Sequence, residues 1–308
     1  MAIDVSIMIE GQDGLSWPRW QRLTRAVEDL GFNGLYRSDH FTNPEGPVKE
    51  DVETWISLAW LASHTSRIQF GTMVSPISFR HPSILGWQAA SIDALAGGRL
   101  RLGVGAGWQE REHHAFGFDL LDVPERFARF EEAIQILKAI TRSTTPSTFE
   151  GEYFQIRDAQ LVTRSPRADG PPITIGGNGP KRTLPLVAKY ADEWNAVYPS
   201  LAAYPELTAR LNELLAAEGR KPGDVKRTVM SRGLVGKDDA DLASQIDAEG
   251  LQRLIDRDAP VGTPDQIVEK LGIYAEAGIE GVMLQWLDLD DLSHLELFAE
   301  KVLPQLRG

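Results

Sequence analysis

The chain has 308 residues, 42% of them hydrophobic and 25% charged, and a formal net charge of −12. This charge argues against an unaided nucleic-acid or anionic-membrane surface. The absence of cysteine excludes disulfides, thiolate catalysis and cysteine-ligated metals. The N-terminus lacks the basic start and apolar run of a signal peptide, and no stretch approaches the roughly 20 apolar residues of a membrane span. We therefore expect a soluble, cytoplasmic protein.

The first half of the chain alternates between short apolar runs and amphipathic segments. The apolar runs predict strands at 5–9, 34–40, 67–75 and 99–107. The segments that follow them predict helices at 16–31, 51–65, 82–97 and 123–140. Ser16, Pro18 and Gly31 suit the start, first turn and end of the first helix.

Residues 144–171 interrupt this alternation with a predicted hairpin around residues 150–151 and a proline-rich link. The pattern then resumes, with strands predicted at 171–177, 192–198, 226–236 and 280–286. Helices are predicted at about 180–191, at 203–218, from 263 onward and at 291–306. A polar, acidic insertion fills 237–260.

These elements form eight strand–helix pairs. Helices of ten or more residues between successive strands imply parallel pairing. Eight such pairs predict an α/β fold, a TIM (β/α)₈ barrel, with insertions after the fourth and seventh strands. An open doubly wound sheet is the structural alternative. Because no fixed-period repeat or low-complexity linker is present, we predict a single domain over residues 1–308.

In such barrels the reacting groups gather at the carboxyl ends of the strands. The positions selected by this rule are largely apolar, aromatic and glycine residues, with few ionisable groups: 39–40, 72–76, 105–108, 176–179, 194–198 and 285–286. This composition favours a pocket for a flat ring system over a metal or hydrolytic centre. No P-loop or G-x-S-x-G pattern occurs, which disfavours an NTPase or a serine hydrolase.

His40 is the candidate for proton chemistry, since an imidazole pKa near 6.5 lets it exchange a proton at neutral pH. Asp39 could orient His40 or hydrogen-bond a polar edge of a ligand. In the structural interpretation, Asp39 caps the following loop and His40 is a satisfied buried histidine. The residues alone leave both interpretations open.

The sequence GGNGP, residues 176–180, directly follows a predicted strand and is the candidate anion site. Glycines let backbone N–H groups approach a phosphate, and a helix start adds its positive dipole end. A bound anion would explain Lys181 and Arg182 in the first turn, where cations are otherwise unfavourable. A solvated glycine-rich loop is the alternative. Pro185 would break a helix that starts at 180, so the helix could instead begin with Thr183 as its cap.

Two other motifs have weaker chemical meaning. GVGAGW, residues 103–108, is not a dinucleotide fingerprint, because its sixth position is Trp108. Its glycines either let a flat ligand lie against the backbone or allow tight packing at the strand exit. EREHH, residues 110–114, is predicted to be a solvated charged turn, not a metal site.

Together these segments resemble the luciferase-like monooxygenase superfamily of flavin and deazaflavin barrels, over nearly the whole chain. The resemblance rests on the order and spacing of LGFNGLYRSDHF, FGTMVSPISFRHP, GGRLRLGVGAGW, ERFARFEEAIQIL and ITIGGNGPKRTLPLVAKYADEWN. The chain is most similar to the branch that depends on coenzyme F420, a deazaflavin. The resemblance implies that F420, or FMN as the alternative, binds at the carboxyl ends of the barrel strands.

The family pattern also implies the roles of individual residues. His40 would lie beside the reacting ring carbon, with Asp39 in support, and a cis peptide bond would join Met73 and Val74. Arg37, Lys181 or Arg182 could meet the acidic tail of F420. No metal is implied. The implied cofactor contacts are Thr72, Met73, Val74, Gly105, Ala106, Gly107, Trp108, Gly176, Gly177, Asn178 and Gly179.

The resemblance predicts an F420-dependent oxidoreductase that transfers a hydride between the deazaflavin and a small organic substrate. The alternatives are an FMN-dependent monooxygenase using reduced flavin and O₂, a non-catalytic coenzyme-binding barrel, and a metal-dependent barrel hydrolase. Sugar-phosphate dehydrogenases of this branch have a catalytic glutamate where this chain has Trp108, so the substrate stays open and Trp108 favours an apolar one. The resemblance also allows a homodimer and a reductase partner that supplies reduced cofactor.

Overall fold

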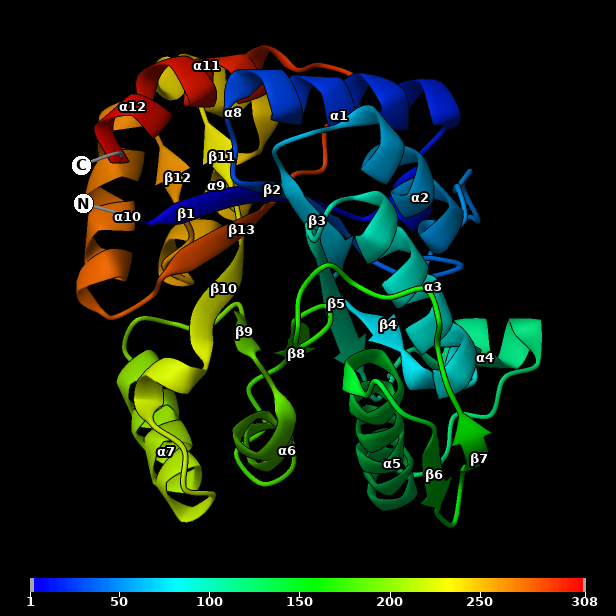
Figure 1. The fold of residues 1–308 in the computed structure, drawn as a ribbon. Coiled ribbons are helices and arrows are strands. Elements are labelled where there is room, and N and C mark those ends of the chain that lie inside the picture. The colour runs from blue at the N-terminus through cyan, green and yellow to red at the C-terminus, as the bar shows by residue number, and fades with distance from the viewer. Residues whose placement is uncertain (1–2, 307–308) are drawn as a thin grey trace.

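The computed structural model describes residues 3–306 and shows a barrel of parallel strands surrounded by helices (Figure 1). Neighbouring strands follow the order β3–β2–β1–β13–β10–β9–β8–β5–β4, and an additional pairing of β3 with β5 closes the barrel. All these pairs are parallel. The predicted TIM barrel is confirmed, and the open doubly wound alternative is wrong.

The eight barrel strands correspond to the eight predicted apolar runs. They are β1 (Asp4–Ile9), β2 (Gly34–Arg37), β3 (Gln69–Thr72), β5 (Leu100–Gly105), β8 (Ile173–Gly176), β9 (Glu193–Val197), β10 (Lys226–Arg232) and β13 (Gly281–Gln285). A two-residue strand, β4 (Ser75–Pro76), follows β3 and also pairs with β5. The peptide bond Met73–Val74 between β3 and β4 is cis, as the resemblance implied.

Helices cover the outside of the barrel. They are α1 (Trp17–Leu30), α2 (Thr54–His64), α3 (Pro82–Leu95), α5 (Val123–Arg142), α6 (Thr183–Tyr190), α7 (Tyr204–Ala217), α10 (Pro264–Glu276), α11 (Ser293–Lys301) and α12 (Leu303–Leu306). Three short 3-10 turns are η1 (Gly11–Asp13), η2 (Ile77–Phe79) and η3 (Pro222–Asp224). Because α6 starts at Thr183, Pro185 lies in its first turn, where proline is tolerated. The start predicted near residue 180 was therefore wrong.

Further elements lie in two places between barrel strands. Between β5 and β8 the chain forms α4 (Glu110–Phe116) and the predicted hairpin, made of β6 (Ser147–Glu150) and β7 (Gln155–Ala159). Between β10 and α10 it forms β11 (Leu234–Val235), α8 (Asp239–Gln245), α9 (Ala248–Asp256) and β12 (Val261–Gly262). Strands β11 and β12 pair with each other in a separate small sheet.

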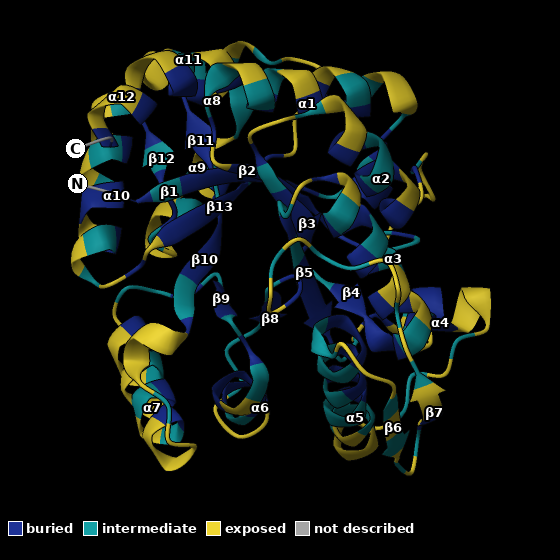
Figure 2. Ribbon diagram, viewed as in Figure 1, coloured by how far each residue is buried: buried dark blue, intermediate teal, exposed yellow. Residues whose placement is uncertain are grey.

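Alternation along the strands creates two apolar layers. Outward residues such as Ile7, Ile9 and Leu35 pack in the main core between strands and helices, while the outer faces of the helices are exposed (Figure 2). Inside the barrel a second cluster contains Met8, Tyr36, Met73, Met230 and Met283. This methionine cluster is apolar and adaptable. Within residues 3–306, no helix combines the length and apolarity that a membrane crossing requires.

Candidate active site

A cavity of about 920 Å³ opens at the carboxyl ends of the barrel strands. Met8, Met73 and Met230 of the methionine cluster contribute to its wall. Its volume lies within the range of roughly 300–1,000 Å³ typical of small-molecule and cofactor sites. Of the predicted site residues, the lining includes His40, Met73, Val74, Gly107, Trp108, Gly176 and Gly177.

His40 follows β2 and forms a buried pair with Glu112 of α4. Nδ1 of His40 lies 2.7 Å from Oε1 of Glu112, whose side chain is fully buried. The second carboxylate oxygen, Oε2, accepts a 2.9 Å hydrogen bond from the backbone N–H of Phe41. Because a carboxylate only accepts, Nδ1 must carry the proton, which leaves Nε2 as the basic nitrogen of the neutral ring. Within residues 3–306, Nε2 makes no hydrogen bond.

The environment raises the pKa of His40 above its ordinary value. Burial alone would lower this pKa, but the hydrogen bond and negative charge of Glu112 outweigh it, aided by the charges of Glu10 and Asp39. The imidazolium form is therefore stabilised at a position that lines the cavity. A perturbed histidine in a pocket is a functional-site candidate.

Residues 108–109 connect the histidine to the rest of the rim. The rings of His40 and Trp108 meet edge to face, with centroids 5.8 Å apart. Gln109 is buried and exchanges two hydrogen bonds with Thr42, from Nε2 to the carbonyl and from the threonine hydroxyl to Oε1. His113 donates from Nδ1 to the carbonyl of Gln109, and its Nε2 hydrogen-bonds the hydroxyl of Ser78. These contacts fix the segment that holds Trp108 beside His40.

Asp39 does not hydrogen-bond His40, so it does not orient the imidazole directly, which was one of its two predicted roles. Its carboxylate accepts hydrogen bonds from Ser75 at 2.6 Å and from both terminal nitrogens of Arg80, at 2.6 and 3.2 Å. The residue is buried and does not line the cavity. Glu112, not Asp39, hydrogen-bonds His40, because side chains of successive residues after β2 point in different directions.

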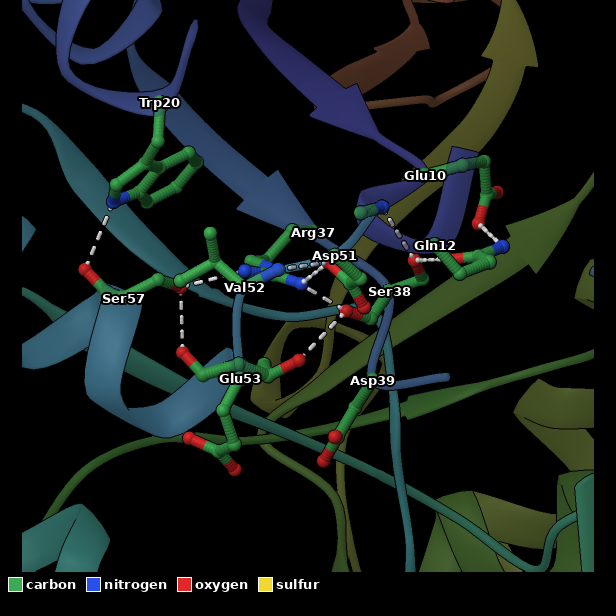
Figure 3. Close-up of polar contacts among 12 residues, drawn as sticks. Glu10, Gln12, Trp20, Arg37, Ser38, Asp39, Asp51, Val52, Glu53 and Ser57 are labelled. Atoms are coloured by element: carbon green, nitrogen blue, oxygen red, sulfur yellow. Dashed lines mark hydrogen bonds and ion pairs between the residues drawn. The ribbon is translucent and has the colours of Figure 1, made fainter. Parts of the chain in front are cut away.

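A chain of hydrogen bonds spans the rim from β9 to β2. Tyr198 donates to Gln285, Gln285 donates to Glu10, and Gln12 donates to the second oxygen of Glu10. Ser38 completes the chain by donating to Gln12 at 2.6 Å, as Figure 3 shows for its Glu10–Gln12–Ser38 part. All five residues line the cavity, so this wall is polar, and its polar groups hydrogen-bond one another.

Arg37 lies behind this wall and is fully buried (Figure 3). It donates to Asp51 at 2.8 Å and to the hydroxyl of Ser57 at 2.7 Å, and its guanidinium lies over the ring of Trp20. The prediction that Arg37 could meet a cofactor tail is wrong, because the guanidinium is enclosed. Its contact with Asp51 instead anchors the loop between β2 and α2.

The predicted contacts near β3 and β5 divide into two groups. Met73, Val74, Gly107 and Trp108 line the cavity. Thr72 is buried, and its hydroxyl donates to the carbonyl of Gly103 in the neighbouring strand. Gly105 and Ala106 do not line the cavity either. At Gly105 the role is close packing, because a Cβ atom there would come within 2.6 Å of Val74.

The glycine segment after β8 approaches the cavity through its backbone. Gly176 and Gly177 line the cavity, whereas Asn178 and Gly179 do not. The side chain of Asn178 is tied to β9, donating to the carbonyl of Val197 and accepting from its N–H. The backbone N–H groups of Asn178 and Gly179 make no hydrogen bond within residues 3–306. Lys181 and Arg182 are exposed nearby and form no ion pair within the same range.

Sequence reasoning missed Glu112, and the solvated turn predicted for residues 110–114 was wrong at two positions. Glu112 and His113 are buried, while Glu110 and His114 are exposed. It also missed Glu10 and Gln12, although the strand-end rule, applied to β1, would have selected them. Within residues 3–306, no three histidine or acidic side chains gather as a metal site.

Comparison with known proteins gives matches over most of the chain. The model of the luciferase-like monooxygenase family matches residues 3–255. An F420-dependent glucose-6-phosphate dehydrogenase of Kineococcus radiotolerans is 27% identical over 314 residues, covering 91% of this chain and 90% of the relative. The 4-hydroxyprotoasukamycin monooxygenase of Streptomyces nodosus subsp. asukaensis is 29% identical, over 67% of this chain and 53% of the relative.

Solved structures share the fold at lower identity. An F420-dependent secondary alcohol dehydrogenase in complex with an F420-acetone adduct has a TM-score of 0.84 and 19% identity, over the full length of both chains. The oxygenating constituent of 3,6-diketocamphane monooxygenase from Pseudomonas putida, in complex with FMN, has a TM-score of 0.79 and 17% identity, over 99% of both chains. Because the family model covers most of the sequence, the chain belongs to the luciferase-like monooxygenase family.

Proposed function

We propose that the chain is an oxidoreductase that uses coenzyme F420 and exchanges a hydride with a small organic substrate held beside His40. The observation that carries this proposal is the His40–Glu112 pair at the cavity wall, which leaves Nε2 of the histidine without a protein partner within residues 3–306. The names of relatives that align over about nine-tenths of the chain support the deazaflavin. FMN, named in a solved structure of the same fold, is the alternative.

The cavity fits a flat ring with an anionic tail. Its apolar lining, from Met8, Met73 and Val74, suits the ring faces. Gly176 and Gly177 present no side chain to the cavity, so a ligand can approach their backbone closely. The unpaired N–H groups of Asn178 and Gly179, with exposed Lys181 and Arg182, would hold a phosphate.

When bound, the deazaflavin supplies hydride chemistry at a ring carbon. The protein's contribution is proton handling and orientation. With Nδ1–H held by Glu112, the neutral His40 ring presents Nε2 as the base that takes a proton from a substrate heteroatom during oxidation. The buried carboxylate of Glu112 then stabilises the imidazolium, and His40 returns the proton in the reverse reaction.

Titration of the purified protein with F420 and with FMN tests the cofactor. We expect saturable binding of F420 at low concentration and much weaker binding of FMN. Substituting His40→Gln should leave F420 affinity unchanged and lower turnover by about 100- to 10,000-fold, the usual contribution of a general acid or base. Tighter binding of FMN would favour the monooxygenase, and turnover that survives the substitution would remove His40 from the chemistry.

We also infer that a second copy of the chain covers the outer faces of α2 and α3. Ile56, Ile84 and Trp87 are 61%, 49% and 58% exposed there, and adjoining exposed apolar residues mark interaction surfaces. Among Asp, Glu, Lys and Arg, these two helices contain only Asp93, which is buried. Two copies would therefore meet at these faces without repulsion between like charges. Light scattering should find a dimer and, for Trp87→Glu, a monomer; a monomeric parent protein contradicts the inference.

A further inference from the structure

The charge of the cavity lining restricts the substrate. Within residues 3–306, no lysine or arginine lines the cavity, whereas Glu10, Asp13 and Glu45 do. Both oxygens of Glu10 accept hydrogen bonds from neutral amides, and within residues 3–306 Glu10 forms no ion pair with a lysine or arginine. Lys49 reaches the rim, but its ammonium is paired with Asp13 at 2.5 Å. A phosphate near His40 would therefore meet carboxylates without the lysine or arginine partners that phosphate sites use.

Apolar surface surrounds the same part of the cavity. Trp108, in edge-to-face contact with His40, is 60% exposed, and Leu287 at the rim is 41% exposed. Pro44, from the loop between β2 and α2, lines the cavity as well. Burying such surface against an apolar ligand is favourable by about 25 cal/mol per Å². The His40 side of the cavity thus favours an apolar body, and within residues 3–306 no lysine or arginine lines it to pair with a dianion.

Three cations without an ion pair within residues 3–306 lie away from the His40 side of the cavity. Lys181 and Arg182 follow the glycine segment after β8, where the proposed function places the cofactor's phosphate. Arg232 ends β10 but does not line the cavity, and its Nη1 atom is buried without a partner. The cationic and apolar parts of the site are therefore separate, one suited to the cofactor tail and the other to the substrate.

We propose that the His40 side of the cavity takes an uncharged, largely apolar alcohol or the corresponding carbonyl compound, and not a phosphorylated sugar. This inference rests on the proposed function. Oxidation of the alcohol would break its O–H and C–H bonds: the proton would pass to Nε2 of His40, a bound deazaflavin would accept the hydride, and a C=O bond would form. An alcohol O–H donates to neutral Nε2 and a carbonyl oxygen accepts from its protonated form, so one imidazole serves both directions.

The test compares a series of alcohols of increasing chain length with glucose 6-phosphate, using the F420-loaded enzyme. We expect kcat/KM to rise about fourfold per added methylene until the cavity is filled, and no turnover of the sugar phosphate. Two results overturn the inference. One is a higher kcat/KM for glucose 6-phosphate than for every alcohol, and the other is a steeper rise of kcat/KM with chain length for primary amines than for alcohols. A separate titration with F420 tests the proposed function. If F420 does not bind, the proposed function fails; if F420 binds, the substrate series tests the inference alone.

Binding without turnover gives a second readout. Titrating a long-chain ketone into the cofactor-free protein should change the fluorescence of Trp108, and Trp108→Phe should abolish this change. Trp87→Phe is the matched control, because Trp87 lies on α3, on the face inferred to contact a second copy, and does not line the cavity. If the change persists in Trp108→Phe and is lost in Trp87→Phe, the assigned apolar wall is wrong. In turnover, Trp108→Ala should flatten the rise with chain length, and Trp87→Phe should not.

Discussion

The two sides of the cavity are built in opposite ways. Around His40, side chains are held in place by buried partners: Glu112 is fully enclosed, and Gln109 is tied to Thr42. After β8, the backbone of Gly176 and Gly177 lines the cavity, and the one polar side chain, Asn178, is occupied by Val197. In the proposed function, proton chemistry would therefore use fixed charges from distant segments, whereas anion binding would use an uncovered backbone.

After His40→Gln itself, the largest effect should come from removing the fixed negative charge of Glu112 beside His40. Replacing Glu112→Gln keeps the size of the side chain but loses the charge that raises the pKa of His40. We expect kcat/KM to fall by about 100-fold, in line with losses seen for residues that orient a catalytic group. Alcohol oxidation requires neutral His40, so activity rises as pH passes the pKa of His40. In the variant this rise should move to lower pH.

The pH–rate profile shows whether Glu112→Gln acts through the protonation of His40 or through a general structural effect. Glu110→Gln is the matched control, because Glu110 lies in the same short helix but is exposed. It should leave both the rate and the profile unchanged. A Glu112→Gln profile that coincides with that of the parent protein would show that Glu112 does not set the protonation of His40.

Asp39 belongs to the same side but should affect stability more than chemistry. Asp39→Asn removes a buried charge from Arg80, which also pairs with Glu53. We expect the free energy of unfolding to fall by about 2 kcal/mol, because an imperfectly paired buried cation remains. The kcat of the folded protein should stay within about threefold. Urea denaturation measures the first effect.

The contrast between the two sides also explains what the sequence could reveal. The fold was predictable, because strand and helix periods alternate eight times and several helices have local capping signals, such as Ser16 before α1. The position of Gly176 and Gly177 at the cavity wall was also predictable from local sequence, because these residues are contiguous and follow one strand. Gly176 and Gly177 needed only the rule that ligands bind beyond the carboxyl ends of strands.

The His40 side depends on contacts that no local pattern encodes. Glu112 lies 72 residues after His40, and its neighbours are charged, which favoured a solvated turn. Only the way α4 packs buries Glu112 and His113 while Glu110 stays exposed. Arg37 was misassigned because its partner, Asp51, is brought to it by a loop that has no regular secondary structure. Buried ion pairs of this kind are set by tertiary structure.

On the glycine side, Gly176→Ala tests close approach of the cofactor directly. A Cβ atom at Gly176 would lie 3.4 Å from Val74, an ordinary contact, so the protein itself should accommodate the methyl group. The methyl group would instead occupy space at the cavity wall. We expect the dissociation constant for F420 to rise about tenfold, a loss of about 1.4 kcal/mol. Gly223→Ala, which meets nothing within 4 Å, is the control; unchanged F420 affinity in Gly176→Ala would place the cofactor elsewhere.

The smallest effect should come from the exposed cations beside that backbone. Arg182→Ala should weaken F420 binding by only about threefold, because an exposed charge pair in water contributes little. Its signature is salt dependence: the difference between variant and parent protein should disappear at 1 M salt, where charges are screened within about 3 Å. The loss in Gly176→Ala should persist there, since it is steric. If the losses of F420 affinity in Gly176→Ala and Arg182→Ala both vanish at high salt, the segment after β8 binds the cofactor by charge alone. The shape of its backbone would then not distinguish it from the residues around His40.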